Sequence, residues 1–438
     1  MYEKLIAEGF LEPIDLYYAD MHHPNDENGK ALLTAVMQSA RQGHLCLDLE
    51  NIEGPAEWIV AVKMGATQSF PQLVYDEKRV YLEKNYLFET EILQELKRLI
   101  GPSHLSKIDA NLTDEQQAAF DLVRSENISI IEGGPGTGKT YLTTELVKSF
   151  GPSAQIILAA PTGKATYRLK KNNPHAICKT VHSLLGMKEK TFIQADLIVV
   201  DEASMLDVKM LRQLLKSVPT GQRLVFLGDG NQLPPIESGS LFNDLIDLIP
   251  TAHLTNSLRS DRKEILDLAS SILQGIPPTP HGPLSYESIK NFSVTILTPL
   301  RDGPLGVKTL NALLEGSQEQ TPIMITRNDP QTGLSNGDTG LLISPNMAQF
   351  DDKIFPISEL PPFESAYALS IHKSQGSEFD HVMVLAPPGT EVFGREILYT
   401  AVTRARQSVV LLGDTEVIKK TIQTTSTKRS GINQRFKL

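Results

Sequence analysis

A glycine-rich run that ends in a lysine and a threonine is the part of the sequence best suited to chemistry on phosphates. The run reads G-G-P-G-T-G-K-T and lies between the aliphatic segment 128–131 and a predicted helix over 141–150. A loop between a strand and a helix turns its backbone N–H groups toward phosphate oxygens. Lys139 is therefore expected to reach the β- and γ-phosphates of a nucleotide, and Thr140 to bind Mg²⁺. The predicted nucleotide-binding residues of the run are Gly133, Gly134, Pro135, Gly136, Thr137, Gly138, Lys139 and Thr140.

Two carboxylates follow a second aliphatic segment, in the run V-V-D-E-A-S over residues 199–204. Asp201 is expected to hold Mg²⁺ through its coordination shell, and Glu202 to orient and polarise the attacking water. The pair could instead cap the next helix, but capping does not explain why a strand leads directly into it.

Further candidates for the nucleotide site lie outside these two runs. Gln232, in G-D-G-N-Q, could sense the γ-phosphate, although the residues of this run are also typical of an ordinary turn. Arg259 and Arg404 are candidates for an arginine finger, which would stabilise charge on the transferring phosphoryl group; each could instead form a surface ion pair. The sequence has no N/T-K-x-D motif for guanine, so ATP is favoured, and Gln116 in L-T-D-E-Q is the candidate for contacting adenine.

Composition narrows the class of protein. The chain has 438 residues, of which 40% are hydrophobic and 21% charged, as in a globular protein of two or three domains. No apolar run reaches the length of a membrane helix, and the first residues lack a signal-peptide pattern, so we expect a cytoplasmic protein with no membrane association. Two widely spaced cysteines, Cys46 and Cys178, argue against disulfide, zinc or iron–sulfur chemistry.

The net charge of −10 is unevenly distributed. Residues 1–110 contain 10 Lys and Arg against 18 Asp and Glu, so this quarter carries −8 and the rest is near neutral. An acidic module suggests a protein partner rather than DNA, and a solvated surface is the plainer alternative.

Short aliphatic runs alternate with helical sequence in two series, which predicts parallel sheets of the α/β class. The first series covers 128–131, 156–160, 197–200 and 224–227, and the second covers 294–297, 323–325, 382–385 and 409–412. We expect an N-terminal partner-docking domain of α+β or helical type over 1–110, an ATP-binding domain over 111–252, and a second α/β domain over 253–438 with a small β-rich insertion over 338–364. The polar, basic tail over 419–438 is expected to be disordered, although it could touch DNA phosphates.

The order of the motifs resembles superfamily 1 DNA helicases of the RecD type, over residues 40–415. The matching motifs are L-T-D-E-Q, G-G-P-G-T-G-K-T, A-P-T-G-K-A, T-V-H-S-L-L-G, D-E-A-S-M-L, G-D-G-N-Q-L-P-P, H-K-S-Q-G-S-E-F and Y-T-A-V-T-R-A-R. The resemblance implies two tandem RecA-like P-loop domains, ATP and Mg²⁺ in the cleft between them, and 5′→3′ movement along single-stranded DNA. Glu378 would lie near the nucleotide ribose.

The resemblance also implies which residues contact DNA, through its backbone and without sequence preference. The implied contacts are Thr162, Lys164 and His182 in the first domain, and Arg327, Asn328, His372, Lys373 and Ser374 in the second. Segments 43–49, 297–307 and 325–340 are similar to the complex-bound members of the family. That likeness implies RecB and RecC as partners in a heterotrimer, and broken or tailed duplex DNA as the substrate in recombinational repair.

The sequence departs from this family in its lengths. Only about ten residues, 187–195, separate T-V-H-S-L-L-G from the strand that leads to Asp201, where such helicases often carry a hairpin that splits the duplex. Whether the chain can separate DNA strands without partners is therefore an open question. Two alternatives remain: a stand-alone 5′→3′ helicase, or a regulatory subunit that binds ATP. Only 32 residues follow Arg406, so nuclease activity is expected to belong to a partner.

Overall fold

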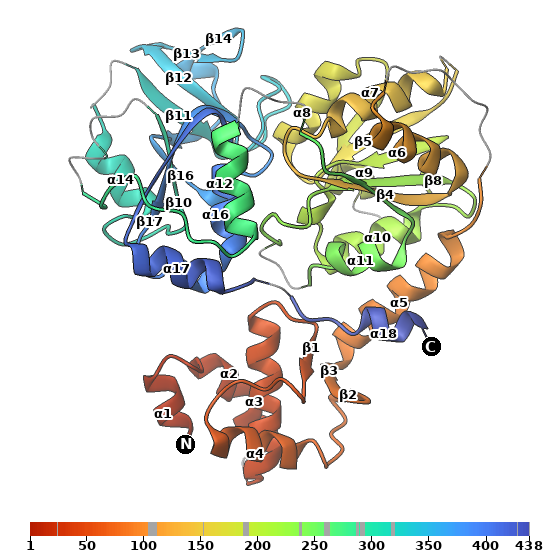
Figure 1. Cartoon of the computed structure of the whole chain (residues 1–438), viewed down its shortest axis with the longest axis vertical. Coiled ribbons are helices and arrows are strands. Elements are labelled where there is room, and N and C mark those ends of the chain that lie inside the picture. The colour runs from red at the N-terminus through yellow and green to blue at the C-terminus, as the bar shows by residue number, and fades with distance from the viewer. Residues whose placement is uncertain are drawn as a thin grey trace.

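The computed structural model divides into an N-terminal domain and two α/β domains that lie side by side (Figure 1). The structure describes residues 1–23, 25–103, 112–151, 153–186, 192–235, 239–257, 263–285, 289, 294–316, 320–426 and 428–437. Among these residues, none of the helices has the length and apolar character needed to cross a membrane.

The N-terminal domain packs helices against a small antiparallel sheet in the order β1-β3-β2. Its central helix, α3, starts where the Asp26 carboxylate accepts a hydrogen bond from the Gly29 N–H at 3.1 Å. Trp58 of α4 is 1% exposed and packs into the core beside it. The elements are α1 (Tyr2–Ala7), α2 (Pro13–His22), α3 (Glu27–Arg41), β1 (Cys46–Asp48), α4 (Ala56–Gly65), β2 (Leu73–Asp76), β3 (Arg79–Leu82) and α5 (Glu83–Leu99).

The first α/β domain is built on a parallel sheet in the order β6-β5-β7-β8-β4-β9. Its strands are buried on both faces, since Ile130 and Ile131 of β4 pack into the hydrophobic clusters on opposite sides of the sheet. The predicted first series of strands is thereby confirmed. The elements are α6 (Asp114–Ser125), β4 (Ile128–Gly133), α7 (Lys139–Ser149), β5 (Ile156–Ala160), α8 (Gly163–Asn172), β6 (Ile177–Thr180), α9 (Val181–Leu185), β7 (Leu197–Val200), α10 (Val208–Ser217), β8 (Arg223–Gly228), α11 (Phe242–Leu248) and β9 (Thr251–Leu254).

The second α/β domain has a smaller parallel sheet in the order β16-β10-β17-β18. Its helices α12 and α16 face the first domain (Figure 1). The elements are α12 (Lys263–Leu273), β10 (Thr295–Thr298), α14 (Val307–Leu314), β16 (Ala368–Ser370), α15 (Ile371–Ser374), β17 (Phe379–Ala386), α16 (Arg395–Val402), β18 (Ala405–Gly413) and α17 (Thr415–Gln423).

The segment 323–325, expected in this parallel sheet, instead lies in an antiparallel sheet in the order β14-β13-β12-β11-β15. It is buried on both faces because Ile323 packs into the core of the small sheet and Met324 into that of the parallel domain. A strand that is buried on both faces is an apolar run whether its sheet is parallel or antiparallel. The sequence of the run therefore could not show which strands it pairs with. The β-rich insertion is thus larger than 338–364; its strands are β11 (Thr321–Ile325), β12 (Thr339–Ser344), β13 (Met347–Phe350), β14 (Lys353–Pro356) and β15 (Phe363–Ser365).

The expectation of a disordered tail was wrong. Residues 428–437, which we call the C-terminal strap, run back to the N-terminal and first α/β domains, where α18 (Ile432–Lys437) lies beside α5 (Figure 1). Arg435 pairs with the fully buried Glu89 carboxylate at 3.0 Å and lies 3.8 Å from the centre of the Tyr86 ring. The strap is ordered by partners far away in sequence, which local polarity cannot reveal.

His44 makes the strap sensitive to acid. Its Nδ1 accepts a hydrogen bond from the Arg429 N–H at 2.9 Å, so this nitrogen must be unprotonated. Burial, with Arg429 and Lys428 nearby, lowers the pKa of His44 to about 4. A depressed histidine pKa contributes stability that is present above the unfolded value of about 6.5 and is lost as the pH falls toward 4.

We expect His44→Gln, which can accept the same hydrogen bond without titrating, to reduce this acid sensitivity. Because the ring is partly exposed, the wild-type protein should lose about 1–2 kcal/mol more unfolding free energy between pH 6.5 and 4 than the variant. Denaturant unfolding at several pH values measures the difference, and the exposed His175→Gln is the matched control. Equal pH profiles for wild type and His44→Gln would contradict the assignment.

Candidate active site

The glycine-rich loop joins the buried strand β4 to α7 and has the geometry of a phosphate cradle. Gly136 and Gly138 have φ values of 79° and 88°, in the left-handed region that favours glycine. The Lys139 ammonium is held at the loop by the carbonyl oxygens of Gly133 and Gly134, the second at 2.9 Å. Lys139 and Thr140 open α7, so their side chains start at the helix end that attracts anions.

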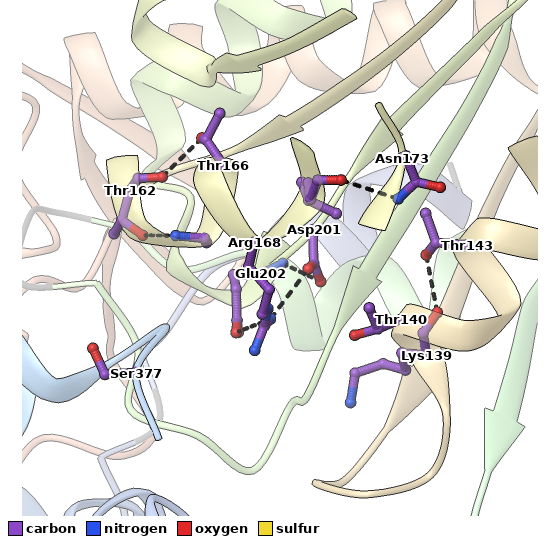
Figure 2. A network of polar contacts seen from close by, with 12 residues as sticks. Lys139, Thr140, Thr143, Thr162, Thr166, Arg168, Asn173, Asp201, Glu202 and Ser377 are labelled. Atoms are coloured by element: carbon purple, nitrogen blue, oxygen red, sulfur yellow. Dashed lines mark hydrogen bonds and ion pairs between the residues drawn. The ribbon is translucent and has the colours of Figure 1, made fainter. Parts of the chain in front are cut away.

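Asp201 and Glu202 follow the fully buried strand β7 directly, and face the side of the site where Lys139 and Thr140 lie (Figure 2). Asp201 is 4% exposed, and its Oδ1 accepts a hydrogen bond from the Glu202 N–H at 2.9 Å. Burial raises the pKa of Asp201, the nearby Glu202 raises it further, and the cations Arg168 and Lys139 oppose the shift. Glu202 has a φ of 53°, a strained conformation for a residue with a side chain, as is found at functional sites.

A cavity of about 440 Å³ lies between the two α/β domains and brings most of the predicted nucleotide-site residues together. The first domain supplies residues 134–140, Asp201, Glu202 and Gln232 to its lining. The second domain supplies Glu378, Arg404 and Arg406. Residues from both domains can therefore contact one bound molecule.

The Arg404 guanidinium is 5% exposed and carries a charge that its neighbours do not neutralise. It donates hydrogen bonds to the carbonyl oxygens of Thr400 and Ser377 and to the Thr403 hydroxyl, at 3.1 to 3.4 Å. Within the described part of the chain, no carboxylate lies at salt-bridge distance from it. A buried cation with only neutral partners is suited to an anionic ligand.

Gln232 lies at the contact between the domains. Its Nε2 donates to Asp229 Oδ2 at 3.4 Å, and the Tyr399 hydroxyl of α16 donates to the same oxygen at 2.8 Å. Gln232 Oε1 is buried and has no hydrogen-bond partner among the described residues. A buried polar atom without a partner is unusual and fits a site that receives a ligand or its metal ion.

Of the three remaining predicted residues, one lines the cavity, one lies outside its lining and one falls outside the described residues. Gln116 is 2% exposed and lies under the glycine-rich loop, where its amide caps α6 through Thr113 and contacts the Thr137 carbonyl at 3.5 Å. Its role toward adenine stays a prediction. Glu378 lines the cavity and pairs with Arg406 at 3.2 Å, whereas Arg259 lies outside the described residues.

Two of the DNA-contact residues predicted in the first domain lie at the N-terminal end of α8. Thr162 caps this helix by accepting from the Ala165 N–H at 3.3 Å. Lys164 points toward the β-rich insertion, with its Nζ 3.3 Å from Thr339 Oγ1 and 5.5 Å from the centre of the Phe379 ring. Burial lowers the pKa of Lys164. His182 lies on α9, beyond β6.

The DNA-contact residues predicted in the second domain differ in exposure. Arg327 and Asn328 are exposed just after β11, whereas Lys373 on α15 pairs with Glu364 at 2.9 Å. Burial lowers the pKa of His372. Ser374 is fully buried, and its hydroxyl donates to the Ile371 carbonyl at 2.7 Å, so it does not face solvent.

Sequence reasoning missed Arg168 and Tyr399. Arg168 lies 3.4 Å from the carboxylates of Asp201 and Glu202, and its position four residues after Lys164 was the available signal. Tyr399, in Y-T-A-V-T-R, had no such signal because its partner, Asp229, lies 170 residues away.

Comparisons with known proteins agree with this architecture. Residues 111–283 match the family described as AAA domain, and residues 365–412 match the UvrD-like helicase C-terminal domain. The RecBCD enzyme subunit RecD of Mycobacterium tuberculosis is 27% identical over 549 aligned positions, which cover 98% of this chain and 95% of the relative. The ATP-dependent RecD2 DNA helicase of Deinococcus radiodurans is 31% identical over 68% of this chain and 49% of its own length. A Pif1 helicase of Bacteroides bound to single-stranded DNA shares the fold over 70% of this chain and 94% of its own, with a TM-score of 0.51 and 19% identity.

Tandem RecA-like domains around one nucleotide cleft, with these matches, define the class: the chain is an ATP-dependent DNA helicase. The alignment with the Mycobacterium relative has 549 positions, more than the 438 residues of this chain, so that relative carries additional segments. Within its class, the chain belongs to the RecD type.

Proposed function

We propose that this chain is the motor subunit of a RecBCD-type complex and moves 5′→3′ along single-stranded DNA at broken or tailed duplex ends. One observation carries the proposal: residues of both domains line the same nucleotide cavity, so hydrolysis there can change the spacing of the domains. The Mycobacterium relative, a subunit of a RecBCD enzyme, aligns through the N-terminal domain as well. The RecD2 relative covers only 68% of the chain, which favours the complex-bound role over a stand-alone helicase.

The position of each residue in the cavity suggests its role in ATP hydrolysis. Lys139 binds the β- and γ-phosphates, and Glu202 orients the water for attack. Arg404, from the second domain, stabilises charge that develops on the transferring phosphoryl group. Thr140 and Asp201 would hold Mg²⁺, which would neutralise phosphate charge.

Coupling to movement runs through Gln232 and its neighbours. The unpartnered Oε1 of Gln232 is an acceptor, so it would meet the nucleotide through the attacking water or the metal ion, while Asp229 beside it is bonded to Tyr399 of the second domain. A change at the γ-phosphate therefore reaches α16 through a short chain of contacts. Both domains bind the sugar–phosphate backbone of DNA. The predicted contact residues lie at α8, after β11 and at α15.

The N-terminal domain supplies the proposed surface for RecB or RecC, since it is acidic and carries none of the nucleotide-site residues. Such a complex would act on chromosomal DNA in the cytoplasm. Nuclease activity would come from a partner.

ATP hydrolysis with and without single-stranded DNA tests the proposal, on the chain alone and together with its partners. We expect DNA to stimulate hydrolysis, and Lys139→Gln to abolish it. A complex with Lys139→Gln that unwinds normally would favour a regulatory ATP-binding subunit instead. Unwinding of a tailed duplex by the chain alone at ordinary protein concentration would favour a stand-alone helicase.

A further inference from the structure

Helix α8 lies between the nucleotide cavity and the surface around Thr162 and Lys164 where DNA is proposed to bind, which we call the DNA groove. At its N-terminal end it meets the β-rich insertion of the second domain, where Lys164 Nζ lies 3.3 Å from Thr339 Oγ1. Gly163 approaches Ser335 so closely that a Cβ on the glycine would lie 2.4 Å from the serine Cβ. A displacement of the insertion or of the groove is therefore transmitted to this helix.

One turn further along α8, Arg168 reaches the carboxylates of the nucleotide site. Residues four apart share one face of a helix, so Lys164 and Arg168 extend from the same side. The Arg168 Nη2 lies 3.4 Å from Asp201 Oδ2 and 3.4 Å from Glu202 Oε1 (Figure 2). Arg168 also experiences the charge of Glu378 from the second domain.

The contacts of Arg168 are long, which suits a side chain that changes partners. A strong arginine–carboxylate pair has N···O distances of about 2.7–2.9 Å, shorter than either contact here. The Arg168 Nε is buried without a hydrogen-bond partner among the described residues. The guanidinium is thus placed among several carboxylates without being fixed to one of them.

Glu202 depends on Arg168 for the direction of its side chain. Its backbone is held in the left-handed region, which limits the paths open to the carboxylate. That carboxylate is contacted by the Arg168 guanidinium at 3.4 Å. A shift of α8 that moves the guanidinium therefore turns the group that is to orient water.

We propose that Arg168 is a positioning residue that transmits DNA contact at the N-terminal end of α8 to the orientation of Glu202. This inference rests on the proposed function, because it needs DNA in the groove beside Thr162 and Lys164. DNA in the groove shifts α8, Arg168 moves with the helix, and Glu202 takes the orientation needed for hydrolysis. The stimulation of hydrolysis by DNA thus depends on one side chain that borders the nucleotide cavity and reaches Glu202 from α8.

The test compares ATP hydrolysis by Arg168→Ala and wild type with and without oligo(dT), using the full chain with its partners where these are needed for activity. Removing a group that orients a catalytic residue typically costs about 10–100-fold. We expect the DNA-stimulated kcat to fall at least about tenfold toward the DNA-free rate, while KM for ATP and Kd for oligo(dT) change less than about twofold. Arg168→Lys should restore part of the stimulation, because an ammonium can still pair with one carboxylate.

Lys170→Ala is the matched control, since it removes an exposed cation from the same helix and should keep wild-type stimulation. Arg168→Gln, of similar size, decides the matter if the alanine variant does not fold. Wild-type stimulation in Arg168→Ala, or an equal loss of the DNA-free rate and of ATP affinity, overturns the inference. A wild-type enzyme that DNA does not stimulate would instead refute the proposed function.

Discussion

Replacement of Arg404 by alanine is expected to lower kcat for ATP hydrolysis by about 10³-fold or more, because an arginine finger contributes that much to phosphoryl transfer. The structure gives the reason: Arg404 is buried at the cavity, and its hydrogen bonds go to neutral oxygens, so its charge is available to a phosphate. A group that acts mainly on the transition state lowers kcat and leaves ATP affinity largely unchanged. Steady-state kinetics and equilibrium binding of ATP measure the two effects.

The control for this loss is Arg301→Ala, which removes an exposed arginine of the same domain. Arg404→Lys should remain strongly impaired, because one ammonium cannot reproduce the forked geometry of a guanidinium. A fall in ATP affinity as large as the fall in kcat would show that Arg404 binds the ground state and is not a finger.

Replacement of Glu202 by glutamine is expected to reduce kcat by about 10²–10⁴-fold, the range found when a general base is removed. The amide keeps the size of the side chain and its contact with Arg168, but it cannot polarise water as a carboxylate does. ATP binding should persist, since Lys139 and the glycine-rich loop are untouched. Single-turnover hydrolysis beside nucleotide binding separates these steps.

Glu264→Gln, at an exposed position on α12, provides the matched control and should retain wild-type kcat. If Glu202→Gln hydrolysed ATP at more than about a tenth of the wild-type rate, another residue would have to orient the water.

The nucleotide site could be predicted from the sequence because its parts are local. Strand, glycine-rich loop and helix are contiguous around Lys139, and Asp201 follows its own strand directly. The predictions of parallel sheets, tandem domains and the helicase class were confirmed for the same reason. Each motif is contiguous in sequence with the strand or helix that positions it.

Features that depend on distant partners could not be predicted. The strand at 323–325 looks like any buried strand, and only its neighbours decide which sheet it joins. The strap was judged by its polar composition, yet Arg435 finds a buried carboxylate on α5. Arg168 carries no motif of its own; its role becomes visible only when α8 packs beside β5 and β6 and its side chain reaches Asp201 at the end of β7.

The pairing of Arg435 with Glu89 also fixes an order of events during synthesis. These residues are 346 positions apart, so at about 5–20 residues per second the ribosome needs roughly 17–70 s to supply the cation after the carboxylate. A lone carboxylate is costly to bury, so this end of α5 is expected to stay hydrated on the nascent chain. The N-terminal domain therefore completes its packing only after both motor domains have been translated, and a partner that recognises its finished surface can bind only then.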